Sequence, residues 1–218
     1  LNEHIHLEEE IYKTAIDVLC KIQTCNKSLE AFPVHDKNVL LSGLDDFINY
    51  SGKYDSNFKN EFYQIWNKLL IKLPKPKYLA LRDYHVDNLI WLSDRDKLRR
   101  IGLLDYQDAS VSYLGYDVLS LIEDARRYVP YDNRTKYLQH FMTSSKLENE
   151  TEFLQEYAIL AAQRNMRIFG LFIKYGKAQG KEIYLQYLPN VKKYLLQDLK
   201  HPVLKQLKKL CEPILKDH

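Results

Sequence analysis

Apolar residues recur every three or four positions along most of the chain, which is the spacing that gathers them on one face of a helix. The clearest example is the segment 7–25, where the apolar positions run from Leu7 through Ile11 and Ala15 to Ile22. The same period predicts further helices at residues 39–50 (where Gly43 weakens the regularity), 57–73, 117–128, 133–144, 151–174, 181–187, 191–199 and 202–215. The pattern therefore predicts a mainly helical protein.

The centre of the chain follows a different pattern. Two apolar runs, residues 88–92 and 101–104, flank a charged turn at residues 93–100, which is typical of a β-hairpin with a polar loop. Residues 78–81 are expected to form a short strand that leads into it, and residues 109–114 a connector. Many helices and one small hairpin make the expected fold class α+β and mostly helical.

Three oxygen-bearing side chains lie at one end of this hairpin. Asp83 and Asn88 stand before the first run, five residues apart, and Asp105 follows the second run. Closing the hairpin would bring all three together. Carboxylate and amide oxygens suit a hard cation such as Mg²⁺, and one carboxylate would remain to orient a hydroxyl nucleophile.

These residues also carry a resemblance to a known family. Kinase-fold phosphotransferases place a catalytic Asp five residues before a metal-binding Asn, as in H-R-D-x-x-x-x-N. The chain has LRDYHVDNL at residues 81–89, LLDYQD at 103–108 and YDVLSLIEDARR at 116–127. In these stretches it resembles the aminoglycoside phosphotransferase family, and most closely its branch of N-acetylmuramate/N-acetylglucosamine kinases.

The resemblance implies a fold, an activity and roles for the three residues. The fold would be the C-terminal lobe of a kinase-like structure, and the reaction an ATP-dependent transfer to a small-molecule hydroxyl, with an amino sugar as acceptor. Asp83 would be the catalytic base, while Asn88 and Asp105 would bind Mg²⁺. The sequence departs from the general kinase pattern in two places, because Leu81 replaces the usual His and Gln107 replaces the glycine of D-F-G. The second change argues against a flipping activation segment.

Five further residues are candidates for substrate binding, each with a simpler alternative. His85 either contacts substrate or hydrogen-bonds the loop backbone. Asp87 is a substrate contact or a loop cap, and Asp108 a substrate contact or the cap of the next helix. Asp46, next to Asp45, faces an acceptor or lies on a solvated helix face. Arg127 contacts an anionic substrate group or complements a helix dipole.

Two other sets of polar residues are expected to have structural roles. Asp117 opens an apolar-periodic run, which favours a structural role over a catalytic one, and Arg126 shares the helix-dipole alternative with its neighbour. Gln163, Arg164 and Asn165 fall inside a long apolar helix, where polar groups are costly unless hydrogen-bonded. We expect these three to anchor the catalytic loop or the segment 116–127.

Composition excludes several classes of protein. A net charge of +3 without a basic stripe is not typical of a nucleic-acid binder. The longest apolar stretch, residues 157–175, contains polar and charged residues, so we expect no membrane association. Three cysteines without a C-x-x-C pair, and no signal sequence, favour reduced thiols in the cytoplasm.

No G-x-G-x-x-G and no V-A-I-K-like strand precedes residue 79, so we expect the N-terminal ATP-binding lobe to be absent from this chain and the chain alone to be inactive. The alternatives are a kinase for another acceptor (an aminoglycoside, choline or homoserine), or a catalytically silent kinase lobe that serves as a binding module. A metal hydrolase is disfavoured because no His-rich ligand spacing is present.

Overall fold

The structure is a computed structural model that describes residues 6–24 and 28–217. The chain divides into two compact units. The first unit comprises Leu1–Val34 and Pro76–Glu150, and the second comprises His35–Lys75 and Thr151–His218. Each unit is made of two stretches that are distant in sequence, and each has its own hydrophobic core.

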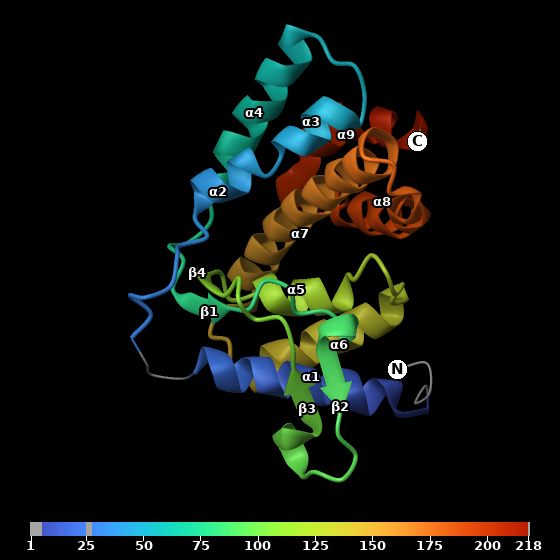
Figure 1. Cartoon of the computed structure of the whole chain (residues 1–218). Helices are drawn as coiled ribbons and strands as arrows, with labels where there is room; N and C mark the ends of the chain where they lie inside the picture. Colours follow the sequence, from blue (N-terminus) through green and yellow to red (C-terminus); the bar gives the residue numbers. More distant parts are fainter. Residues whose placement is uncertain (1–5, 25–27, 218) are drawn as a thin grey trace. The chain divides into compact units, whose positions relative to one another are not determined.

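The first unit is built on α1 (Glu8–Gln23), which packs along α6 (Tyr131–Ser144) (Figure 1). Tyr12 and Tyr137 stack with their ring centroids 4.6 Å apart. The predicted helix at 7–25 is confirmed as far as Gln23, and its expected end at Cys25 lies outside the described residues. Helix α6 also agrees closely with its predicted bounds.

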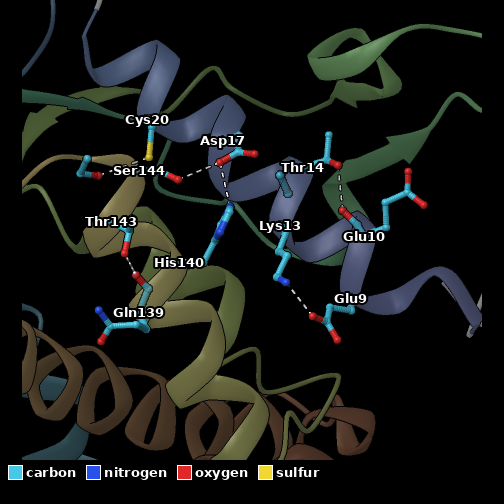
Figure 2. A network of polar contacts seen from close by, with 12 residues as sticks. Glu9, Glu10, Lys13, Thr14, Asp17, Cys20, Gln139, His140, Thr143 and Ser144 are labelled. Atoms are coloured by element: carbon cyan, nitrogen blue, oxygen red, sulfur yellow. Dashed lines mark hydrogen bonds and ion pairs between the residues drawn. The ribbon is translucent and has the colours of Figure 1, made fainter.

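A polar network joins the same two helices. Asp17 Oδ1 on α1 accepts hydrogen bonds from His140 Nε2 at 2.8 Å and from Ser144 Oγ at 3.0 Å, both on α6 (Figure 2). The thiol of Cys20 lies 3.3 Å from Ser145 Oγ. These contacts fix the rotation of α1, which also packs against the hairpin that carries the candidate site.

The predicted β-hairpin is present. Strand β2 (Leu89–Trp91) pairs antiparallel with β3 (Ile101–Leu103), with Leu89 opposite Leu103. Short 3₁₀ turns precede each strand, η2 at Val86–Asn88 and η3 at Lys97–Arg100. A second two-stranded sheet pairs β1 (Tyr78–Ala80) with β4 (Ser110–Ser112), also antiparallel.

In the described residues of the second unit, the regular secondary structure is helical. It contains α2 (Lys37–Ser42), α3 (Asp45–Tyr50), α4 (Ser56–Leu70), α7 (Glu150–Ile173), α8 (Leu188–Asp198) and α9 (Lys205–Asp217). Asp36 and Asp55 cap α2 and α4 with their carboxylates, as N-terminal cap residues do. The aromatic core includes Phe47 and Phe62, whose rings stack 5.7 Å apart.

Three of the predicted elements were wrong in extent. The helix expected at 39–50 is two helices, because the chain turns at Gly43 and Leu44 between α2 and α3. The connector expected at 109–114 contains strand β4. The helix expected at 117–128 is α5 (Tyr116–Ile122), which ends at Glu123 with non-helical backbone angles.

The C-terminal part of the chain is less regular than predicted. Helix α7 continues into a π-helical turn at Lys174–Ala178, and residues 182–187 form a 3₁₀ helix instead of an α-helix. The segment expected at 202–215 begins as the 3₁₀ turn Pro202–Leu204 before α9. Within residues 6–24 and 28–217, no helix combines the length and apolar character needed to cross a bilayer.

Two buried polar residues of α7 have partners in other helices of the second unit. Gln163 Nε2 donates to the carbonyl oxygen of Leu40 in α2 at 2.6 Å. Asn165 Nδ2 donates to Asp198 Oδ2 in α8 at 2.8 Å. These two amides join helices of the second unit to one another, and the expected anchoring of the catalytic loop or of the segment 116–127 by residues 163–165 stays a prediction.

Candidate active site

The candidate site begins at the end of β1, where a buried carboxylate holds the backbone. Asp117, which is fully buried at the start of α5, accepts a hydrogen bond from the backbone N–H of Leu81 at 2.7 Å and from that of Arg82 at 2.9 Å. Arg82 has a φ of 71°, a conformation that non-glycine residues adopt rarely. Asp117 thus compensates for a strained backbone immediately before Asp83.

The next residues fold into a tight turn that joins Asp83 to Asn88. The carbonyl oxygen of Asp83 accepts hydrogen bonds from His85 N at 3.1 Å and from Asn88 Nδ2 at 3.0 Å. Asn88 Nδ2 also lies 3.4 Å from His85 Nε2. The side-chain nitrogen of Asn88 is used in these two contacts. Its side-chain oxygen remains available to accept a hydrogen bond or to coordinate a cation. The Asp83 side chain is exposed to solvent.

The hairpin brings Asp105 to the same end of the ladder as Asn88. The backbone N–H of Leu104 donates to the carbonyl oxygen of Asn88 at 2.9 Å. Asp105 is the next residue after Leu104, so its backbone lies close to that of Asn88. Asp105 is exposed and has a φ of 51°. Backbone strain of this kind persists only where the surrounding structure imposes it, and it is common at functional sites. The structure therefore brings together the chain segments that carry Asp83, Asn88 and Asp105.

His85 and Asp87 lie beside this turn. His85 is buried, and burial lowers its pKa, as does the positive charge of Arg126; the nearby carboxylates of Asp124, Asp83 and Asp87 act in the opposite direction. The net shift of the His85 pKa is downward, which favours the neutral imidazole. Asp87 is largely exposed, and its Oδ2 lies 3.8 Å from Arg126 Nε.

The other predicted substrate contacts of the first unit have different surroundings. Asp108 is exposed on the loop before β4, and it does not cap α5, whose N-cap residue is Gly115. Arg127 forms an ion pair with Glu8 at 2.9 Å, and both side chains are about one-fifth exposed (21% and 22%). Helix α5 ends at Ile122, before the two arginines, and both alternatives for Arg127, a substrate contact and a contact with the helix dipole, stay predictions.

Asp46 belongs to the second unit. Its carboxylate accepts a hydrogen bond from Lys174 Nζ at 3.0 Å, and the same ammonium lies over the ring of Tyr50. The adjacent Asp45 accepts a hydrogen bond from the hydroxyl of Tyr63 at 2.6 Å. Both members of this acidic pair are thus partnered within their own unit, and a contact of Asp46 with substrate stays a prediction.

The donor set fits magnesium better than a permanently bound transition metal. In the described part of the chain, no three His, Cys, Asp or Glu side chains are clustered so as to hold a metal ion. Mg²⁺ is commonly held by one or two protein oxygens, with water and substrate phosphates completing its coordination. Asn88 and Asp105 can supply such a pair, which suits a cation that arrives with a nucleotide.

Comparison with known proteins identifies relatives of this chain. The profile of the phosphotransferase enzyme family (APH) matches residues 2–164. An N-acetylmuramate/N-acetylglucosamine kinase of Caulobacter vibrioides is 29% identical over 215 residues, covering 92% of this chain and 59% of that protein. A kinase of the same name from Pseudomonas aeruginosa is 26% identical over 200 residues, covering 86% and 57%. The chain thus spans a little under three-fifths of the length of these curated relatives.

Two solved structures share the fold. A choline/ethanolamine kinase family protein from Mesorhizobium loti aligns with a TM-score of 0.62 and 11% identity, over 95% of this chain and 66% of that one. A spectinomycin phosphotransferase, in complex with ADP and spectinomycin, aligns with a TM-score of 0.56 and 14% identity, over 93% and 65%. These likenesses confirm the predicted fold class, a mostly helical lobe of a kinase-like fold with a small hairpin. Since the family profile extends over most of the chain and the fold agrees, the chain belongs to the phosphotransferase enzyme family.

Proposed function

We propose that the protein containing this chain transfers a phosphoryl group from ATP to a hydroxyl of an amino sugar of the N-acetylmuramate or N-acetylglucosamine type. The observation that carries the proposal is a pair of hydrogen bonds that hold the segments of Asp83, Asn88 and Asp105 together. These run from Asn88 Nδ2 to the Asp83 carbonyl at 3.0 Å and from Leu104 N to the Asn88 carbonyl at 2.9 Å. The names of the curated relatives support the choice of acceptor.

In this proposal each residue at the end of the hairpin has one task. Asp83 accepts a hydrogen bond from the acceptor hydroxyl, orients it, and takes its proton late in the transfer. Asn88 and Asp105 provide the oxygens that hold magnesium. Magnesium bound there neutralises charge on the nucleotide phosphates, which is a large part of the catalytic task in phosphoryl transfer. Asp117 keeps Asp83 in place by holding the backbone that precedes it.

The chain supplies the lobe that carries the catalytic loop, and further contacts to ATP come from residues outside these 218. This part of the proposal is supported by the length of the relatives, of which the chain spans 59% and 57%. In kinase-fold enzymes a second lobe covers the nucleotide phosphates and contributes a lysine to them. The 218 residues alone are therefore expected to turn over substrate much more slowly than the full-length protein.

A strongly cationic acceptor such as an aminoglycoside is less well supported. Such an acceptor requires unpaired carboxylates, and the acids considered for this purpose are Asp45, Asp46, Asp87 and Asp108. Asp46 is paired with Lys174, and Asp45 with the hydroxyl of Tyr63. Of the four, this leaves Asp87 and Asp108, and Asp87 already lies 3.8 Å from the guanidinium of Arg126.

The test is phosphorylation of N-acetylated amino sugars by the full-length protein with ATP and Mg²⁺, compared between wild type and Asp83→Asn. We expect the substitution to reduce kcat by roughly 10²–10⁴-fold, the usual contribution of a positioned acid–base group. Asp94→Asn, which makes the same change at an exposed position in the hairpin loop, serves as the matched control and should retain activity. A wild-type rate in Asp83→Asn would contradict the role of Asp83, and no sugar phosphorylation by the wild type would contradict the proposed function.

A further inference from the structure

Two consecutive arginines after α5 lie in very different environments. The Arg127 side chain is 21% exposed, and its Nη2 lies at hydrogen-bond distance, 2.9 Å, from Glu8 Oε2. The nearest carboxylate oxygens to the Arg126 guanidinium are those of Asp124 at 3.7 Å and Asp87 at 3.8 Å, and this side chain is 36% exposed. A guanidinium has five N–H donors, and at these distances the two carboxylates attract Arg126 without forming hydrogen bonds to it.

The backbone fixes Arg126 at the catalytic loop. Buried Asp124 accepts a hydrogen bond from the backbone N–H of Arg126 at 2.9 Å, which sets the direction in which the side chain leaves the turn. The guanidinium then reaches Asp87, the residue directly before Asn88.

We propose that Arg126 binds the carboxylate of an acidic amino-sugar acceptor and thereby sets the preference among acceptors. This inference rests on the proposed function. N-acetylmuramate differs from N-acetylglucosamine by a lactyl ether, which adds one carboxylate. In this proposal magnesium held by Asn88 and Asp105 would neutralise the nucleotide phosphates, whereas a carboxylate on the acceptor would meet the guanidinium of Arg126, whose side chain is 36% exposed beside Asp87.

The present surroundings of Arg126 favour such an exchange of partners. Its ion pair with Asp87 is long, and the Asp87 side chain is 63% exposed, so water can replace Arg126 there with little loss. A carboxylate presented by a sugar can instead take two parallel N–H donors, the bidentate geometry that arginine provides and lysine does not. Arg127 has no comparable freedom, because Glu8 already occupies it.

The experiment measures kcat/KM of the full-length protein for N-acetylmuramate and for N-acetylglucosamine, and takes the ratio of the two values. For Arg126→Gln we expect this ratio to fall at least tenfold, mainly through the KM for N-acetylmuramate, and Arg126→Lys should restore it only in part. Arg100→Gln is the matched control, because Arg100 pairs with Glu10 of α1 and is not a candidate for the site. It should leave the ratio as in the wild type.

The outcomes separate this inference from the function on which it rests. If the wild type phosphorylates both sugars and Arg126→Gln leaves the ratio unchanged, the inference about Arg126 is wrong and the proposed function stands. The same holds if kcat falls equally for both sugars, because Arg126 would then act on the transferred phosphoryl group. If the wild type phosphorylates neither sugar, the proposed function fails and the inference fails with it.

Discussion

Asp117 shows how much a single buried carboxylate can do for a catalytic loop. Sequence reasoning assigned it a structural role without identifying what it holds, and the structure adds the two backbone N–H groups of Leu81 and Arg82. The partners are separated from it by more than thirty residues, and no local pattern indicates such a contact. Hydrogen bonds to a charged group are among the stronger ones in proteins. Those to Asp117 help to offset the cost of the positive φ of Arg82.

We expect Asp117→Asn to destabilise the protein and to impair catalysis together. The asparagine keeps the size of the side chain but turns an NH₂ group toward one of the two backbone donors, which leaves that donor unsatisfied in a buried place. The free energy of unfolding should fall by about 1–3 kcal/mol, measured by urea denaturation, and kcat should fall as Asp83 loses its fixed position. Asp94→Asn is the control. An Asp117→Asn protein with wild-type kcat would show that the hydrogen bonds from Leu81 and Arg82 to Asp117 do not position Asp83.

The burial of His85 makes stability depend on pH. Its pKa is lowered below 6.5 in the folded protein, and its Nδ1 is buried without a hydrogen-bond partner among the described residues. As the pH falls below 6.5, His85 therefore binds a proton more readily in the unfolded chain than in the folded one. Protonation then favours unfolding, and the free energy of unfolding decreases. The free energy of unfolding should decrease as the pH is lowered from about 7.5 to about 5.5.

The measurement is urea unfolding across this range for wild type and His85→Gln. The variant should lose part of the pH dependence, and only the difference between the two proteins is attributed to His85. His201, whose pKa is also lowered by burial, contributes to both proteins alike, so its effect cancels. Identical slopes in the two proteins would show that the protonation of His85 is not linked to folding.

At the scale of elements, a glycine sets the contact between two helices of the second unit. A Cβ atom on Gly170 of α7 would overlap the backbone of Asp46 and Phe47 at the start of α3, and backbone cannot move aside as a flexible side chain can. Gly170 therefore allows α3 to lie directly on α7.

Gly170→Ala should thus be destabilising even though alanine favours helix formation. We expect a loss of about 1–3 kcal/mol in the free energy of unfolding, the usual cost of overpacking. The control is Gly102→Ala in β3, where the nearest atom to an added Cβ is Ile90 Cβ at 3.4 Å, an ordinary contact. Equal losses in the two variants, measured by chemical denaturation, would show that the close approach of α3 and α7 is not important for stability.

The elements also show what local pattern can and cannot predict. The hairpin was predicted because its two apolar runs and charged turn are contiguous, and the same stretch contains Asp83, Asn88 and Asp105. Strand β4 was missed because Ser110–Ser112 is only three residues long and depends on pairing with distant β1. The partners of Gln163 and Asn165 could not be predicted either, because they depend on which helices pack against α7.

At the scale of the whole molecule, the two units each combine an early and a late stretch of the chain. Periodicity predicts helices one at a time and does not indicate such a division. The hairpin that carries the candidate site could be located from the sequence because it lies in one continuous stretch, residues 79–108, whereas the roles of Asp83, Asn88 and Asp105 stay predictions. The structure adds the anchoring by Asp117, the ion pair of Arg127 with Glu8, and the position of the Arg126 guanidinium 3.8 Å from Asp87.

The central claim is that Asn88 and Asp105 hold one and the same cation. The most direct test is a double-mutant cycle on the affinity of Mn²⁺, followed by electron paramagnetic resonance, in the full-length protein with a non-hydrolysable ATP analogue. The proteins compared are wild type, Asn88→Ala, Asp105→Asn and the double variant. If both residues ligate one ion, the two losses should be non-additive by about 0.5–3 kcal/mol, as for residues that share a partner. Strictly additive losses, or an affinity unchanged by either substitution, would contradict the account.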